Sequence, residues 1–161
     1  VYTVWLKRHT WLNIVFGGLA GSWAVLAGAA AADPNIGAVP LALAFVLFLW
    51  TPPHFWSLAI AFRADYAAIG VPMLPVVVGD NRAAKVILVS TLALVAASLL
   101  PLAFGLGAIY FAGAVTGGLL FIQKAWLLAR DTNRKTAMTC FHASLIQLTL
   151  VLLGAIIDAQ F

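Results

Sequence analysis

Four uncharged runs dominate this sequence, and each is long enough to cross a lipid bilayer. They cover residues 14–32, 36–62, 86–123 and 136–157, whereas about 18 consecutive apolar residues already suggest a membrane-spanning helix. The third run is long enough for two helices, and Pro101, Gly105 and Gly107 mark the turn between them. The runs therefore predict five transmembrane helices.

The composition excludes a soluble domain. The 161 residues are 64% hydrophobic and 9% charged, against about 45–50% apolar and about 25% charged residues in soluble proteins. The mean hydropathy is +1.05. We predict an all-α fold, a polytopic transmembrane helical bundle that forms a single membrane domain over residues 1–161, with spans at approximately 14–32, 38–62, 86–104, 106–129 and 138–157.

The start of the sequence indicates a fragment. The first residue is Val1, and no charged segment followed by a short apolar core and a cleavage site precedes the first span. An odd set of five helices suggests that a preceding helical half is absent. We therefore expect the chain to be the C-terminal part of a longer membrane protein.

Basic residues are found in alternate loops. The segments 33–35 and 101–107 and the tail from Asp158 contain no Lys or Arg, so the positive-inside rule places them outside the cytoplasm. In a bacterial inner membrane the C-terminus would then be periplasmic and the basic loops cytoplasmic. These charges flank the spans instead of forming a soluble basic face, so no nucleic acid is expected as a partner. The basic residues are Lys7 and Arg8, then Arg63, Arg82 and Lys85, then Lys124, Arg130, Arg134 and Lys135.

Lys7 and Arg8 stand together just before the first span. Adjacent cations suit a phosphate or diphosphate group, because Arg offers a bidentate fork and Lys a compact point charge. The alternative is a charge pair that only marks the membrane boundary. The pair alone does not decide between these two interpretations.

The segment 62–82 contains Pro72 and Pro75 among apolar residues, so it is predicted to pack on the protein or to cover a cavity, and not to form a long helix. Asp65 follows the second span, and a carboxylate at that boundary could hold Mg²⁺ together with a substrate diphosphate. A partner carboxylate must come from elsewhere. Asp80 is the other acid of the segment, and its position before the third span equally favours an N-cap.

The motif TPPHFW, residues 51–56, places an ionisable side chain inside an apolar run. Pro52 and Pro53 are predicted to break the helix, with a new half-helix running from Pro53. His54 would then lie about 13 Å below the cytoplasmic end, where a polar group suggests a functional site. Phe55 and Trp56 add flat surface that suits a planar or prenyl ligand. The alternative is a proline kink whose histidine only bonds a neighbouring helix.

Three segments together resemble one family of enzymes. They are YTVWLKRHTWLNIVFGGLAG (residues 2–21), WTPPHFWSLAIAFRADY (50–66) and GVPMLPVVVGD (70–80). In combination they are similar to the protohaem IX farnesyltransferases, a branch of the intramembrane prenyltransferases typified by 4-hydroxybenzoate polyprenyltransferase. The resemblance covers the C-terminal five of nine helices, in order.

The resemblance implies transfer of a farnesyl group from farnesyl diphosphate to a vinyl group of haem b, with Mg²⁺ as cofactor and haem O as product. It places Asp65 near Mg²⁺ and His54 against haem, either on the iron or on a propionate. It implies a role in catalysis for Lys7, Arg8 and Asp65, and in substrate binding for His54, Arg63, Tyr66 and Trp56. Its implied partners are the two substrates, the bilayer, and haem A synthase or terminal oxidase assembly proteins.

Two departures from the family pattern limit what the chain could do alone. The first Asp-rich motif of the family, which supplies most Mg²⁺ ligands, would precede Val1, and no acid follows Asp65 closely. We therefore expect the isolated chain to be inactive. Two alternatives stay open, namely a prenyltransferase with a quinone-precursor or other aromatic acceptor, and a non-catalytic membrane subunit or transporter.

Overall fold

The computed structural model describes residues 10–160, and the regular structure in that range is helical, without a strand. Five helices within it are long and apolar enough to cross a membrane, which confirms the predicted all-α class. The elements are α2 (Asn13–Ala32), α3 (Ala38–Ala61), α4 (Arg63–Ala68), α5 (Leu74–Val78), α6 (Asp80–Ala97), the 3₁₀ helix η2 (Leu100–Phe104), α7 (Ala108–Arg130) and α8 (Arg134–Asp158).

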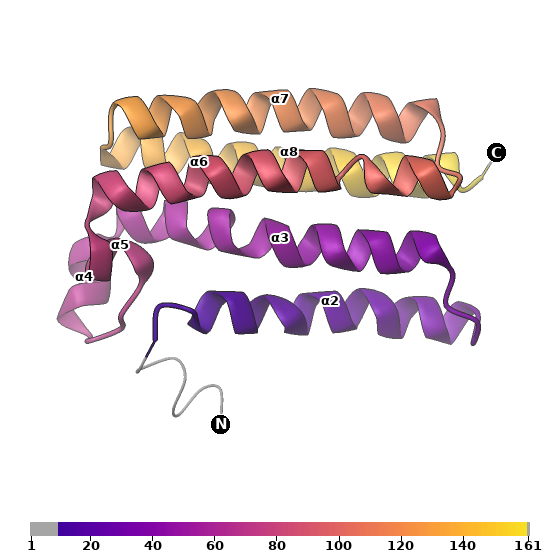
Figure 1. Ribbon diagram of the computed structural model, residues 1–161, viewed down its shortest axis with the longest axis horizontal. Coiled ribbons are helices and arrows are strands. Elements are labelled where there is room, and N and C mark those ends of the chain that lie inside the picture. Colours follow the sequence, from indigo (N-terminus) through magenta and orange to yellow (C-terminus); the bar gives the residue numbers. More distant parts are fainter. Residues whose placement is uncertain (1–9, 161) are drawn as a thin grey trace.

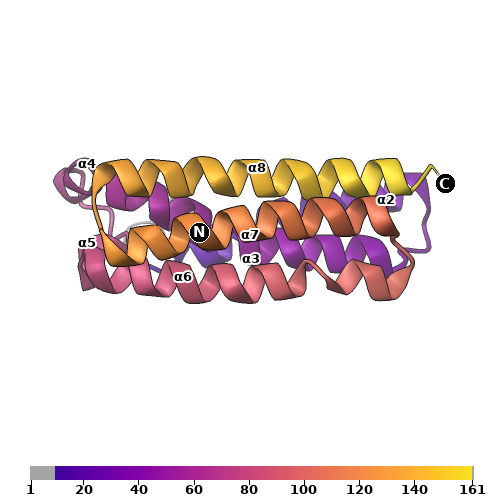
Figure 2. The same ribbon diagram turned by 90° about the horizontal axis from the view of Figure 1, so that it is seen from above.

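The five long helices run side by side, and α3 lies in the middle of the bundle (Figures 1 and 2). Helix α3 packs on α2 on one side and on α6 and α8 on the other, while α7 packs mainly on α8. The core that these contacts form includes Val46, Trp50, Ile87, Leu94 and Phe121. Helix α3 therefore carries the motif 51–56 into the interior.

Helix α3 is continuous through Pro52 and Pro53, so the predicted break with a half-helix starting at Pro53 is wrong. Proline lacks a backbone N–H, so the helix loses two donors here and would be expected to kink. Side chains just before the prolines fasten this turn, because the Thr51 hydroxyl donates to Leu47 O at 3.0 Å and the Trp50 indole N–H donates to Ser144 O at 2.9 Å. Tertiary packing thus overrides the local preference.

The segment 62–82 contains the short helices α4 and α5 and no long helix, as predicted. Met73 and Leu74 are buried, so the segment packs on the protein. Helix α6 begins at Asp80, earlier than the predicted span 86–104, and Gly79 with φ +84° occupies the N-cap position. The predicted capping role of Asp80 is wrong, because its carboxylate points to Arg63 instead.

The turn predicted around Pro101, Gly105 and Gly107 is confirmed. Helix η2 contains Pro101, Gly105 adopts φ +110°, and Gly107 is the N-cap of α7. A left-handed backbone of this kind favours glycine, because a side chain would clash there. The turn reverses the chain at the end of the bundle opposite α4 and α5 (Figure 1).

Candidate functional site

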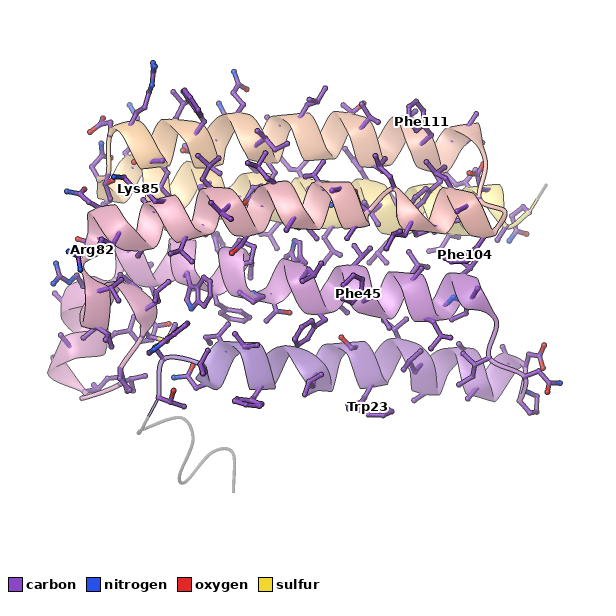
Figure 3. The ribbon with its side chains drawn as sticks, in the orientation of Figure 1. Trp23, Phe45, Arg82, Lys85, Phe104 and Phe111 are labelled. Atoms are coloured by element: carbon purple, nitrogen blue, oxygen red, sulfur yellow. The ribbon has the colours of Figure 1, made fainter. Side chains whose placement is uncertain are left out.

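One end of the bundle, here called the basic end, gathers every Lys and Arg of residues 10–160. Helices α4 and α5, the start of α6, the end of α7 and the start of α8 meet there (Figure 1). Arg82 and Lys85 lie at this end, and Phe104 and Phe111 lie at the opposite end (Figure 3). The basic residues are Arg63, Arg82, Lys85, Lys124, Arg130, Arg134 and Lys135.

Arg63 and Asp80, 17 residues apart, form an ion pair at the basic end, with Nη1 3.4 Å from Oδ2. The two side chains are 47% and 32% exposed. Exposed pairs of this kind are weak, because water screens the charges. The guanidinium of Arg134 lies over the ring of Phe62, 5.2 Å from its centroid. Arg63 and Arg134 therefore both lie where α3 ends. Because its ion pair with Asp80 is weak, Arg63 can release Asp80 and pair with another anion.

Asp65 is an exposed residue in the first turn of α4, and Tyr66 beside it is half-buried. Within residues 10–160, no group of three or more His, Cys, Asp or Glu side chains is placed to hold a metal ion. Magnesium commonly takes one or two protein carboxylates and fills its shell with substrate phosphates and water. Asp65 therefore fits as one ligand of a shared Mg²⁺, and does not form a site by itself.

His54 is buried in the bundle, with 6% of its surface exposed. Its imidazole is stacked between two aromatic rings, with centroid distances of 4.1 Å to Trp50 and 4.5 Å to Phe141. It lies seven residues before the end of α3, which corresponds to about 10 Å along a helix. The structure thus places the predicted intramembrane histidine inside an aromatic sandwich.

Ser144 of α8 fixes both residues of α3 that face it. Its hydroxyl lies 2.7 Å from Nδ1 of His54, and its backbone oxygen accepts the indole N–H of Trp50 at 2.9 Å. Sequence reasoning missed Ser144 and Phe141. The available signal was spacing alone, since Trp50 and His54 are four residues apart on one helix face and Phe141 and Ser144 are three apart on another.

Trp56 is also buried, at 4% exposure, and its ring packs at 6.1 Å from that of Trp11. Its indole N–H finds no hydrogen-bond acceptor in the described part of the chain. His54 therefore contacts α8, whereas Trp56 contacts the segment before α2. Lys7 and Arg8 lie outside the described residues, so the structure does not place them relative to this cluster.

Comparison with known proteins identifies the family of this chain. A sequence model of the UbiA prenyltransferase family matches residues 1–146. This chain belongs to the UbiA prenyltransferase family. Membership confirms the family that the three sequence segments suggested. No solved structure matches the chain.

The curated relatives in this family are similar over the whole of this chain. Protoheme IX farnesyltransferase 2 of Paramagnetospirillum magneticum is 57% identical, over 98% of this chain and 55% of its own length. Protoheme IX farnesyltransferase 1 of the same organism is 54% identical, over 100% of this chain and 57% of its own length. Protoheme IX farnesyltransferase of a Nostoc species is 44% identical, over 99% and 51%. The chain spans about half the length of these relatives.

Proposed function

We propose that the protein transfers the farnesyl group of farnesyl diphosphate to a vinyl group of haem b, forming haem O on the route to haem A. The relatives named protoheme IX farnesyltransferase support this substrate pair. The observation that carries the proposal is the imidazole of His54, buried between the rings of Trp50 and Phe141 inside the basic end. Such a site suits a large, flat, metal-containing acceptor.

The two substrates would occupy different parts of the site. Lys7 and Arg8, together with Arg63, would bind the diphosphate, because guanidinium and ammonium groups pair well with phosphate oxygens. Tyr66 would donate a hydrogen bond to the same group. The porphyrin would bind deeper, against His54. Trp56 faces the segment before α2 and would line another part of the substrate site, where its buried indole N–H can donate to a polar atom of a substrate.

The reaction would break one bond in the donor and form two in the acceptor. The C1–O bond of the farnesyl group breaks, and its electron pair leaves with the diphosphate. The vinyl π electrons then form a C–C bond to C1 of the allylic cation. Water adds to the resulting cation next to the porphyrin ring and loses a proton, which gives the hydroxyethyl group of the product. Basic side chains favour the first step because they stabilise the charge that develops on the diphosphate.

Mg²⁺ completes the proposal as cofactor. Asp65 would supply one carboxylate oxygen, and the further ligands would come from the diphosphate and from residues outside this chain. When bound, the ion neutralises charge on the leaving diphosphate. Because most ligands would lie elsewhere, we expect residues 1–161 alone to be inactive.

The chain is a multi-pass membrane protein with five candidate spans, and we propose a bacterial inner membrane as its location. Basic residues gathered at one end favour a cytoplasmic position for that end. The C-terminus, which follows α8 at the opposite end, would then be periplasmic. Reporter fusions after residue 161 and within 131–133 test this topology, and a cytoplasmic signal from the first fusion would contradict it.

The first experiment is an assay of the complete polypeptide encoded by the gene, in membranes, with haem b, farnesyl diphosphate and Mg²⁺. We expect haem O, detected by chromatography, and its loss in His54→Ala and Lys7→Ala. Prenylation of a quinone precursor without haem O would favour the alternative acceptor. A folded protein that prenylates neither would favour a non-catalytic role. Co-purification with haem A synthase or oxidase assembly proteins would test the proposed partners.

A further inference from the structure

The hydroxyl group of Ser144 lies between two potential partners. Its oxygen is 2.6 Å from the backbone oxygen of Phe141 and 2.7 Å from Nδ1 of His54. A serine hydroxyl has one proton to donate and can accept through its lone pairs. The positions of the two partners therefore determine which of them receives that proton.

The carbonyl of Phe141 can only accept, so the proton between the two oxygens must come from Ser144. Otherwise two oxygen atoms would lie 2.6 Å apart with no proton between them. Because the hydroxyl of Ser144 donates its one proton to Phe141 O, it can only accept from His54. Nδ1 of His54 must therefore be the donor in that contact. The neutral imidazole is thereby held as the tautomer that carries its proton on Nδ1.

This tautomer leaves an unshared electron pair on Nε2 of His54. Within residues 10–160 the ring has no hydrogen bond besides the one to Ser144. The rings of Trp50 and Phe141 cover both faces of the imidazole, at 4.1 Å and 4.5 Å, and so restrict its rotation. In the neutral imidazole, Nε2 is therefore presented in one direction and without a proton.

We propose that Ser144 is a positioning residue that makes His54 a ligand for the iron of the acceptor porphyrin, and not a donor to a propionate. The inference rests on the proposed function, which supplies haem b as substrate. A neutral imidazole nitrogen with a free electron pair is a common ligand of iron, and the hydrogen bond at its other nitrogen orients the ring. A propionate carboxylate would instead require a proton on Nε2.

Binding of two porphyrins to the complete polypeptide tests the inference, because ferric protohaem IX and metal-free protoporphyrin IX share both propionates and differ in the metal. We expect Ser144→Ala to weaken the binding of ferric protohaem by roughly 10-fold to 100-fold, as for other partners of metal-ligating histidines. Affinity for the metal-free porphyrin should not change. His54→Ala should also remove the absorption signature of a nitrogen ligand on iron.

Ser98→Ala is the matched control, because the Ser98 hydroxyl donates to Val95 O at 2.7 Å in the same i−3 geometry, at the other end of the bundle. It should leave both affinities unchanged. Ser144→Thr keeps the hydroxyl and should retain the iron signature. A measurement without substitution uses ¹⁵N-labelled histidine in the wild-type protein, where the His54 signals, identified by their loss in His54→Ala, should show a proton on Nδ1 and none on Nε2.

If Ser144→Ala lowered the affinity for both porphyrins equally, the inference would be overturned in favour of a propionate contact. A protonated Nε2 with a bare Nδ1 in the wild-type spectrum would overturn it as well. The inference would also be overturned if the Ser144→Ala protein were less stable yet bound ferric protohaem with wild-type affinity and spectrum. If the wild-type protein binds neither porphyrin, the proposed function itself fails, which is a different result from a change confined to these variants.

Discussion

Asp158, the last residue of α8, accepts a hydrogen bond from the backbone N–H of Tyr110, in the first turn of α7, at 2.8 Å. The same carboxylate oxygen accepts the N–H of Gly107 at 2.7 Å. The first N–H groups of a helix have no partner within the helix, and a carboxylate there also interacts favourably with the helix dipole. One helix thus caps its neighbour across a separation of 48 residues.

Asp158→Ala should therefore destabilise the bundle. We expect a loss of about 1–2 kcal/mol in the free energy of unfolding, because two N–H groups lose their acceptor. Unfolding in detergent, followed by tryptophan fluorescence, measures the change. Asp33→Ala is the control, since among residues 10–160 the Asp33 side chain accepts only from the nearby N–H of Asn35. Equal stability of the two variants would show that the cap contributes nothing.

Helices α7 and α8 approach closely where glycine leaves room. A Cβ atom on Gly117 would lie 2.8 Å from Cα of Gln147, and one on Gly113 would lie 2.7 Å from the backbone oxygen of Leu150. Backbone atoms cannot move aside as a side chain could, so the helices would have to separate. Close packing of this kind is a main source of helix association in membranes, where small residues gather at interfaces.

Gly117→Ala and Gly113→Ala should each cost about 1–3 kcal/mol in the free energy of unfolding through overpacking. Gly28→Ala is the matched control, because a Cβ atom there meets nothing within 4 Å and alanine favours the helix. The control should be as stable as the wild type or more so. A Gly117→Ala protein that unfolds like the control would contradict the close approach.

The fold class could be predicted from the sequence, because apolar length and proline-glycine turns are local signals. The motif 51–56 could be recognised as unusual for the same reason. Its conformation could not, since two prolines argue locally for a broken helix, while Trp50 and Ser144, 94 residues apart, fasten α3 to α8. A contact of that range leaves no trace in the hydropathy pattern.

The partners of the site residues were also beyond prediction. Asp80 has the sequence context of an N-cap, yet it pairs with Arg63 because the segment 62–82 folds back through α4 and α5. Ser144 is one of several small polar residues in an apolar helix, and only the packing of α3 on α8 gives it a role. Residue types at the site were thus readable, and their pairing depended on tertiary geometry.

Trp50→Phe tests how α3 is fastened next to its prolines. The substitution removes the indole N–H that donates to Ser144 O and keeps an aromatic ring over His54. We expect a loss of about 0.5–1.5 kcal/mol in the free energy of unfolding, the usual contribution of one hydrogen bond. Trp23→Phe is the control, because Trp23 is 66% exposed on α2 and should be tolerated. A loss in Trp50→Phe no larger than in the control would indicate that packing alone holds this turn.

The exposed pair of Arg63 and Asp80 separates a structural role from a role in substrate binding. Asp80→Asn and Arg63→Ala should each change the free energy of unfolding by less than about 1 kcal/mol, because exposed ion pairs contribute little. Their kinetics in the complete polypeptide should differ. If Arg63 binds the diphosphate, Arg63→Ala should raise KM for farnesyl diphosphate by roughly tenfold or more, as expected for the loss of a hydrogen bond between charged groups. Asp80→Asn should leave KM unchanged or lower it, because it frees the guanidinium. An equal rise in KM in both variants would mean that the ion pair, and not Arg63 itself, supports the site.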